Sequence, residues 1–396
     1  MSEIKVNSIK GVSASVAALS INNTDGTCTA NITNNLSNRR LTINGAMTIA
    51  QRGTSSTSSG FHTVDRFACY SSGVDESPTQ AQVDVASGTT PYTSGFRKAL
   101  KITNGNQTGG AGAADYIWIQ HIIEAQDIAN SGWNYTSSSS YVTLSFWIKS
   151  SVAQDFKGYL RSRDGTNYEY PFATGSLSAD TWTKVTKTIS GNSNLQFDND
   201  NGAGLELNIF PFLGTSRTDD PTENAWATYN SSARTKDNTS TWYTTNDATL
   251  EITGVQLEVG SVATDFEHRS FAQELALCQR YCQTFNNDGT QGGDGALIIS
   301  SNGTLYAAAA FFCSVSLKVS MRTKPTISVT TGTNYYAFYT NNTAVVVTGS
   351  GIYMNGTTSI DSVDLNHGGT TIGTSGHASL FRAINPSAKI IVSAEL

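Results

Sequence analysis

The hydrophobic pattern changes its period between Thr249 and Phe285, and this change constrains the fold more than any other feature of the chain. The first part alternates apolar and polar residues at period two, which predicts a β-strand. The alternation slips by one residue at Gly254. A slip would turn the apolar side chains outward unless one extra residue is accommodated, so we predict a β-bulge at this glycine. The apolar positions are Leu250, Ile252, Val255, Leu257 and Val259.

Beyond Phe266 the pattern becomes helical. Ser270 followed three residues later by Gln273 is a capping-box start. Asn286, with the asparagine, aspartate and glycine that follow it, is a stop signal. We therefore predict a linker helix over residues 269–286, between a domain that ends in a long strand and a second domain. The expected apolar stripe consists of Phe271, Leu275, Cys278, Cys282 and Phe285.

The composition favours an all-β chain. Charged residues make up 14% of the sequence, compared with about a quarter in ordinary soluble domains, and aromatic residues make up 10%. The formal net charge of −6 provides no basic stripe, which argues against nucleic acid as a partner. No apolar run approaches the length of a membrane span, so we expect no membrane insertion. The start of the chain lacks an apolar signal-peptide core, so we expect synthesis in a cytoplasm.

The pattern predicts four segments: an extended N-terminal segment (1–40), a β-sandwich (41–268), the linker helix (269–286) and a smaller C-terminal β domain (287–396). Eight strands are expected in the sandwich, a number that suits a double-sheet jelly roll. Two sets of alternating residues should form its core. The first set is Val142, Leu144, Phe146 and Ile148, and the second is Leu205, Leu207 and Ile209. The expected strands are 41–51, 98–102, 116–124, 141–150, 155–162, 182–189, 204–212 and 249–259.

Several long sequence words resemble a known family. ITGVQLEVG, TDFEHRS and ELALCQRY resemble the domain junction of tail-fibre and related virion proteins of tailed phages, marine phages especially. NGAMTIAQRGTSS, TVDRF, SFWIKSS and TWTKVTKTI are similar to the opening and the middle strands of the same module, so the resemblance covers residues 41–285. The shorter words VSMRTKP and KIIVSAEL resemble the distal domain of those proteins.

The resemblance implies a jelly roll of the carbohydrate-binding-module type, carried on a virion appendage. It also implies homotrimers, as in fibres, and an N-terminal segment that attaches to other virion proteins through residues such as Ile4, Val6 and Ile9. The alternative for this segment is a mobile or sandwich-packed terminus. The expected location is the virion, after synthesis in the host cytoplasm.

Aromatic side chains beside polar ones are the groups that stack on sugar rings and bond their hydroxyls. Four residues are therefore candidate glycan contacts, namely Trp118, Trp147, Tyr159 and Trp182. The alternative for each of the four is that its side chain packs in the core or in an interface. A second cluster, Tyr335, Tyr336, Phe338 and Tyr339, is a candidate distal binding tip, with packing between subunits as the alternative. The irregular stretch 214–248 is long enough to be an interaction loop.

No catalytic or metal-binding motif is recognisable. The five histidines have no metal-ligand spacing, and His268 is expected to bond backbone in a turn at the domain junction. Cys278 and Cys282 are expected to pack in a core. The segment from Asp198 to Gly202 lacks the ligands of a calcium-binding helix–loop–helix motif, so a hairpin turn is expected there. Because carbohydrate-binding sandwiches often carry structural calcium, the resemblance leaves a bound calcium ion as an alternative.

The resemblance thus implies a non-enzymatic phage tail-fibre or appendage protein that adheres to bacterial surface polysaccharide as an oligomer. One alternative is a decoration or spacer protein that binds only other virion proteins. The second alternative is a glycan-degrading tailspike. A glycosidase needs two carboxylates that flank the scissile bond, and no recognisable catalytic word supplies them.

Overall fold

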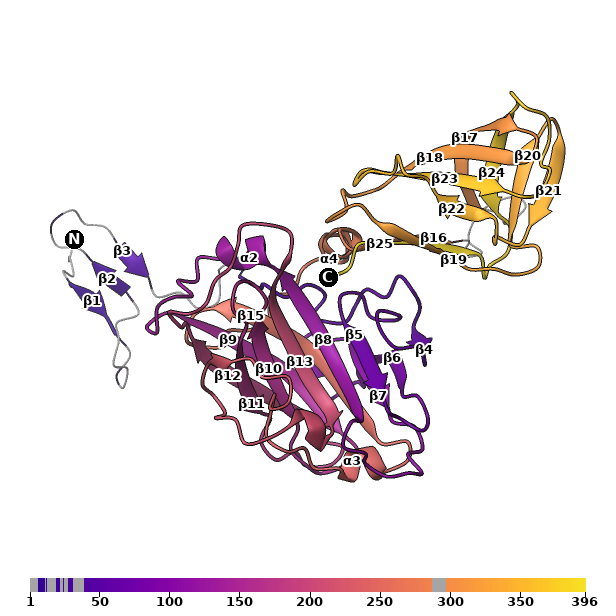
Figure 1. Ribbon diagram of the computed structural model, residues 1–396. Helices are drawn as coiled ribbons and strands as arrows, with labels where there is room; N and C mark the ends of the chain where they lie inside the picture. Colours follow the sequence, from indigo (N-terminus) through magenta and orange to yellow (C-terminus); the bar gives the residue numbers. More distant parts are fainter. Residues whose placement is uncertain are drawn as a thin grey trace.

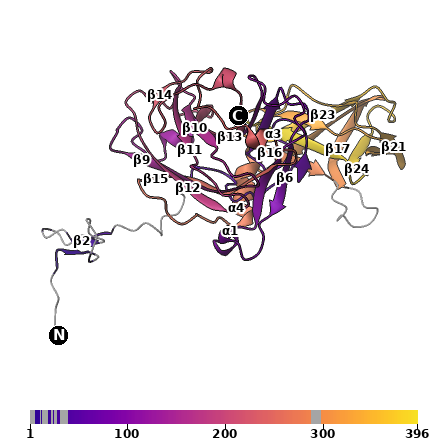
Figure 2. The ribbon, with the colours of Figure 1, turned by 90° about the horizontal axis from the view of Figure 1, so that it is seen from below.

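The computed structural model describes residues 6–10, 12, 19–21, 24, 28–30, 39–286 and 297–396. Its described part is almost entirely β-strand, with four short α-helices and one 3-10 helix. A large sandwich and a smaller β domain lie side by side, and a three-stranded sheet near the N-terminus stands apart from the sandwich in both views (Figure 1, Figure 2). The predicted all-β class with a jelly-roll sandwich is confirmed.

Two antiparallel six-stranded sheets form the sandwich. The first, called the β8 sheet, has the order β14-β11-β10-β13-β8-β5, and the second, called the β9 sheet, has the order β12-β9-β15-β7-β6-β4. The chain crosses repeatedly between the sheets, as in a jelly roll. The strands are β4 (Ser55–Ser56), β5 (Ala68–Ser72), β6 (Thr79–Asp84), β7 (Lys98–Thr103), β8 (Tyr116–Glu124), β9 (Tyr141–Ser150), β10 (Lys157–Ser162), β11 (Tyr168–Ala173), β12 (Thr183–Ser190), β13 (Ala203–Leu213), β14 (Ala227–Thr228) and β15 (Thr249–Val259). The short helices are α1 (Thr90–Thr93), α2 (Ala125–Ala129), the 3-10 helix η1 (Thr215–Arg217) and α3 (Thr241–Thr244).

The sandwich core lies between the sheets, where the predicted alternation places it. All residues of the two predicted core sets are at most 4% exposed and belong to one buried cluster. The cluster also includes Trp242 and Tyr243 of α3, whose side chains are fully buried. The stretch 214–248 is therefore anchored at its C-terminal end by two buried rings.

The predicted bulge at Gly254 is confirmed, whereas the predicted strand 41–51 is wrong. The pairing of β15 with β9 shifts register between Thr253 and Gln256, and Gly254 has φ +65°. Residues 41–50 form an irregular segment instead of a strand. The buried Asn44 side chain accepts a hydrogen bond from the Ile49 amide and donates to the Ile49 carbonyl. These local bonds satisfy backbone groups that would otherwise need a strand partner.

The linker helix α4 (Phe271–Gln279) has the predicted capping box but is shorter than expected. The chain turns at Arg280 and forms β16 (Cys282–Asn286), which pairs with the distant strand β25 (Lys389–Ser393). The pairing explains why the helix was predicted too long, because β25, the partner of β16, lies about a hundred residues away along the chain and gives no local signal. Phe271 is also 65% exposed, so it lies outside the buried stripe. Cys278 and Cys282 are buried free thiols, as expected.

The C-terminal domain packs a seven-stranded sheet, of order β21-β20-β24-β17-β18-β23-β22, against the three-stranded sheet β16-β25-β19. One buried cluster with residues from both sheets forms its core. The remaining strands are β17 (Leu297–Ala307), β18 (Ala310–Ser316), β19 (Thr326–Val329), β20 (Tyr336–Thr340), β21 (Thr343–Val347), β22 (Ile352–Met354), β23 (Ser362–Gly368) and β24 (Ala378–Ala383).

Buried ion pairs join the two domains. Glu395, next to the C-terminus, pairs with Arg66 and, at 3.1 Å, with Arg52 of the sandwich. The Arg66 guanidinium also lies 3.5 Å from the centre of the Tyr281 ring. Arg280 pairs with Glu124 of β8 at 2.7 Å. These contacts attach the α4–β16 turn and the end of the chain to one end of the sandwich.

The N-terminal sheet consists of β1 (Ser8–Ile9), β2 (Leu19–Ile21) and β3 (Cys28–Ala30), paired antiparallel in that order. Val6 and Ile9, two of the predicted attachment residues, are 40% and 52% exposed. Ile4, the third, lies outside the described residues. Virion attachment through this segment therefore stays a prediction.

Candidate functional site

The outer side of the β8 sheet carries an unusual group of aromatic rings. Strand alternation on β8 turns Ile117, Ile119 and Ile123 into the core and turns Tyr116 and Trp118 outward. Tyr159 of β10 and Phe210 of β13 lie beside them, buried at 2% and 0% exposure. We call this surface the Trp118 face. Its residues are the rings of Tyr70, Tyr116, Trp118, Tyr159 and Phe210 and the polar side chains of Gln120, Glu206 and Asn208.

Neighbouring rings of the Trp118 face contact one another. Tyr116 stacks on Trp118 with ring centres 4.1 Å apart and planes 11° apart. Tyr70 on β5 meets Trp118 edge-on at 6.0 Å, and Tyr159 meets Phe210 at 5.5 Å. Tyr70, Tyr116 and Trp118 are partly exposed, so parts of these rings are accessible to a ligand as apolar contact surface.

A polar network lies next to these rings. The Glu206 carboxylate accepts hydrogen bonds from Tyr159 Oη at 3.0 Å, from Asn208 Nδ2 and from Arg163. Burial, and secondarily the Glu206 charge, raises the pKa of Tyr159 well above its usual value, so the phenol stays a hydrogen-bond donor. The pairing of β10 with β13 places Tyr159 directly opposite Asn208. The face therefore combines donors, acceptors and rings within three adjacent strands.

Several buried polar atoms of this surface have no hydrogen-bond partner among the described residues. They are Trp118 Nε1, Asn208 Oδ1, Glu169 Oε2, Arg161 Nε and Arg217 Nε. Asn208 and Glu169 are only 1% and 2% exposed. A buried polar group without a partner costs about 1–3 kcal/mol, so a ligand hydroxyl that reaches one of these atoms would relieve an unfavourable state.

The stretch 214–248 folds back over the Trp118 face. Tyr229 lies over Arg161, with the guanidinium 3.5 Å from the ring centre. The Arg234 guanidinium lies 5.4 Å from the Trp118 ring centre. Sequence reasoning identified this stretch as an interaction loop but missed these contacts, because positions 161, 229 and 234 share no sequence pattern.

A second candidate lies on the outer side of the other sheet. Trp147 of β9 lines a pocket of about 510 Å³ whose walls include Phe96, Phe266 and His268, with Lys184 beside the ring. His268 lies 3.0 Å from the Ser94 carbonyl oxygen through its Nε2 atom, which confirms the expected turn contact. We call this the Trp147 pocket.

The four predicted glycan contacts thus divide between two sheets. Trp118 and Tyr159 share the Trp118 face, whereas Trp147 and Trp182 lie on the β9 side. Trp182 is partly buried, with Lys149 Nζ 5.1 Å from its ring centre. A single glycan-binding surface contains at most two of the four residues.

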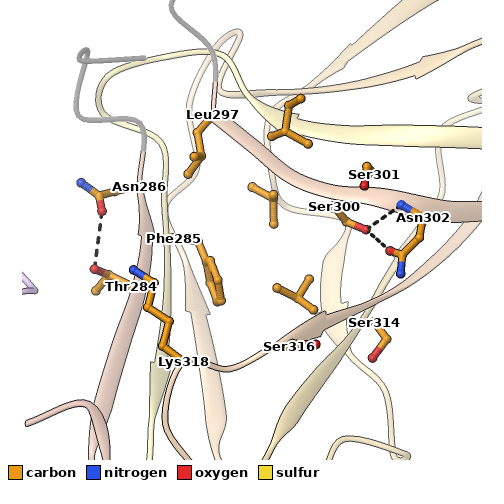
Figure 3. A pocket seen from close by; sticks show the side chains of 13 residues that line it. Thr284, Phe285, Asn286, Leu297, Ser300, Ser301, Asn302, Ser314, Ser316 and Lys318 are labelled. Carbon is orange, nitrogen blue, oxygen red and sulfur yellow. Dashed lines mark hydrogen bonds between the residues drawn. The ribbon is translucent and has the colours of Figure 1, made fainter. Parts of the chain in front are cut away.

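The predicted distal tip is wrong for two of its four residues. Tyr336 and Phe338 are fully buried in the core of the C-terminal domain, because alternation along β20 turns them inward. Tyr335 and Tyr339 are partly exposed. A pocket of about 500 Å³ in this domain lies between β16 and the β17–β18 hairpin, where Phe285 and Leu297 face serine hydroxyls and Lys318 (Figure 3).

Metal-ligating side chains are not gathered in the described part of the chain. It contains no group of three or more His, Cys, Asp or Glu residues arranged to hold a metal ion. The segment from Asp198 to Gly202 is a bend that connects the two sheets, so the expected hairpin is wrong. Its Asp200 carboxylate accepts a hydrogen bond from the Gly202 amide at 2.8 Å. Within the described residues, no helix has the length and apolar character needed to cross a bilayer.

Comparison with known proteins gives weak structural similarities. No protein-family model matches the chain, and no curated protein sequence matches it. Among solved structures, the enzymatically active domain of tailspike protein 4 from bacteriophage CBA120 has a TM-score of 0.30 and 8% identity, covering 56% of this chain and 22% of that one. A CBM4 structure has a TM-score of 0.27 and 12% identity, covering 55% and 98%. The N-terminal cellulose-binding domain of Cellulomonas fimi β-1,4-glucanase C has a TM-score of 0.27 and 10% identity, covering 55% and 99%.

Proposed function

We propose that this chain is a virion appendage protein of a tailed phage, a tail fibre or similar subunit, whose sandwich binds polysaccharide on the bacterial surface. The phage assignment rests on the sequence words at the domain junction. The glycan assignment rests on one structural observation: partly exposed rings of the Trp118 face lie beside buried polar atoms that lack partners. Sugar rings present apolar C–H faces and hydroxyl edges, and this surface complements both.

The Trp118 face is favoured over the Trp147 pocket because of these unpartnered atoms. In the described residues, neither Trp147 nor any polar residue that lines its pocket has a buried side-chain atom without a partner. The Trp118 face therefore has polar atoms that lack a protein partner, whereas the polar atoms of the Trp147 pocket are either partnered or exposed to solvent. The two tryptophans form a matched pair for mutation, since both lie on outer sheet surfaces of the same sandwich.

The test is a glycan array of bacterial polysaccharides probed with the full chain and with two single variants. We expect Trp118→Ala to weaken binding by at least about tenfold, which corresponds to about 1.4 kcal/mol. Trp147→Ala should leave the affinity within about twofold. The reverse ranking would place the site in the Trp147 pocket and overturn the assignment to the Trp118 face.

The same array tests the two alternatives. A spacer protein that contacts only other virion proteins would bind no glycan at any concentration used. A glycan-degrading spike would release oligosaccharides from the polysaccharide during prolonged incubation. We propose that the chain is not an enzyme, so we expect binding without release of fragments.

We further propose that the chain acts on the virion as an oligomer, a homotrimer by analogy with fibres, attached to other virion proteins through its N-terminal segment. Single glycan contacts are weak, and several linked copies raise the effective affinity by orders of magnitude. Sedimentation of the full chain tests the oligomeric state. Incorporation into particles of a variant lacking residues 1–35 tests the attachment role, because normal incorporation would rule it out.

A further inference from the structure

Several arginines of the sandwich have a carboxylate partner, whereas three on the outer side of the β8 sheet do not. Arg40 pairs with Glu274, Arg66 with Glu395 and Arg163 with Glu206. By contrast, no salt bridge to a carboxylate is found in the described residues for the three arginines beside the Trp118 face. These three are Arg161, Arg217 and Arg234, and the first two also have a buried Nε atom without a hydrogen-bond partner.

The three guanidinium groups lie on aromatic rings of one surface. Arg161 lies 3.5 Å from the centre of the Tyr229 ring, and Arg217 lies 4.9 Å from that of Tyr116. Arg234 lies 5.4 Å from the centre of the Trp118 ring and 5.8 Å from that of Tyr229. Rings stabilise cations weakly compared with an anion, at about 0.5–2 kcal/mol for each contact. The cluster therefore holds three positive charges that an anion would stabilise further.

The carboxylates nearby do not neutralise this cluster. Glu206 is already bonded to Arg163, Tyr159 and Asn208. Glu169 lies opposite Arg161 in the pairing of β10 with β11. Burial raises the pKa of Glu169 to about 7, despite the opposing effects of the Asn230 amide and of the two nearest arginines. The four guanidinium groups of Arg161, Arg163, Arg217 and Arg234 therefore outnumber the two carboxylates Glu169 and Glu206, in a chain whose formal net charge is −6.

We propose that the Trp118 face binds an acidic saccharide, with an oxyanion of the sugar, such as a uronic-acid carboxylate, paired to Arg161 and Arg234 while the sugar ring packs on the aromatic rings. Arginine is well suited to this role, because its planar fork bonds both oxygens of a carboxylate. This inference rests on the proposed glycan binding and adds the charge class of the ligand.

A saccharide suits this surface better than a single-stranded nucleic acid, which also combines negative charge with stacking rings. The unpartnered Asn208 Oδ1 is an acceptor, and a sugar hydroxyl is a donor that satisfies it. An oligodeoxynucleotide carries hydroxyl groups only at its ends, so it offers fewer donors of this kind along its length. Nucleic acid therefore enters the experiment as a competing ligand.

The experiment measures the dissociation constants of the full chain for four ligands. Oligogalacturonate and its methyl ester form a matched pair, because the ester keeps the sugar ring and loses the charge. Inorganic sulfate and an oligothymidylate are the two competing ligands. A host-derived acidic polysaccharide and its carboxyl-reduced form make a second matched pair. We expect each acidic form to bind at least tenfold more tightly than its neutral partner at low salt. This preference should shrink as salt is raised, because exposed charges are screened.

Two variants, Arg161→Gln and Arg234→Gln, should each lose most of the preference while keeping residual binding of the neutral forms. The control is Arg97→Gln, which removes an arginine that lies 3.9 Å from the ring of Tyr92 on the other side of the sandwich. Thermal unfolding of each variant verifies that it is folded, and Arg234→Gln alone carries the test if Arg161→Gln is not folded.

Equal binding of acidic and neutral forms, unaffected by salt, would overturn the charge assignment and leave the proposed glycan binding intact. Binding of no saccharide would overturn both. Tighter binding of oligothymidylate than of any acidic glycan would replace the saccharide with nucleic acid. Binding of free sulfate as tight as that of the oligosaccharide would reduce the site to an anion site without sugar recognition.

Discussion

Arg66 and Glu395 form a buried ion pair although 329 positions separate them in the sequence. The pair connects the irregular segment before β5 with the end of the chain, and Arg52 shares the same carboxylate. The last strand, β25, therefore enters a junction that holds the C-terminal domain against the sandwich. The stability of this junction depends on a residue one position from the C-terminus.

We expect Glu395→Ala to lower the free energy of unfolding by about 3–5 kcal/mol, because it leaves the buried Arg66 without its carboxylate and leaves Arg52 only the longer pair with Asp65, at 3.9 Å. Denaturant titration measures this loss. The control is Asp84→Ala, which removes the partner of Lys98 in an exposed ion pair and should cost less than about 1 kcal/mol. Equal, small effects of the two substitutions would show that the junction does not depend on Glu395.

Gly254→Ala should destabilise the sandwich more than a glycine substitution at another left-handed position. Gly254 has φ +65°, and a methyl group there would lie 2.7 Å from the Phe96 ring. Gly88 has φ +82° and no atom within 4 Å of such a methyl group, so Gly88→Ala costs only the backbone strain, about 1–2 kcal/mol. We expect the cost at Gly254 to be at least twice as large in chemical denaturation. Indistinguishable costs would mean that Phe96 moves away freely.

The raised pKa of Glu169 predicts that the free energy of unfolding depends on pH. Its pKa is raised from 4.5 to about 7 in the folded chain by burial, opposed by the Asn230 amide, Arg161 and Arg234. Between these two pH values the unfolded chain has lost a proton that the folded chain retains, so raising the pH favours unfolding. This contribution to stability is complete below about pH 4.5 and is lost as the pH rises through about 7.

Melting temperatures of the wild type and of Glu169→Gln between pH 5 and 8 measure this effect. The wild type should lose stability with rising pH more steeply than the variant. Asp65, whose pKa burial raises to about 6, acts in the same direction in both proteins and leaves a residual slope. Parallel curves would contradict the role of Glu169.

Removal of divalent metal should leave the melting temperature unchanged within about one degree. The Asp200 carboxylate near the β12–β13 connection is already bonded to the Gly202 amide. Repeating the melt with added EDTA and with added calcium measures the effect. A rise of several degrees with calcium would identify a structural ion, as ligand binding stabilises the folded state.

Features set by neighbouring residues could be predicted from the sequence. The inward alternation along β9 and β13, the bulge at Gly254 and the capping box at Ser270 each depend on residues only a few positions apart. The helix end was misplaced because Cys282 pairs with Ser393, and that partner left no local signal.

The candidate site was only partly predictable for the same reason. Alternation shows that Trp118 and Trp147 each lie on a strand surface, but not that they belong to different sheets. Arg161, Arg217 and Arg234 are scattered along the chain and meet only because the stretch 214–248 folds back over β8 and β10. Three-dimensional proximity was needed to find them.

The sandwich begins and ends at nearly the same point, since Arg40 pairs by backbone with Glu258 and by side chain with Glu274 of α4. A pulling force applied between the N-terminal strands and the C-terminal domain would therefore run through this short Arg40–α4 link. Together with the Arg280 and Glu395 ion pairs, this link would confine the load to one end of the sandwich, so the rest of the two large sheets would carry little of the tension.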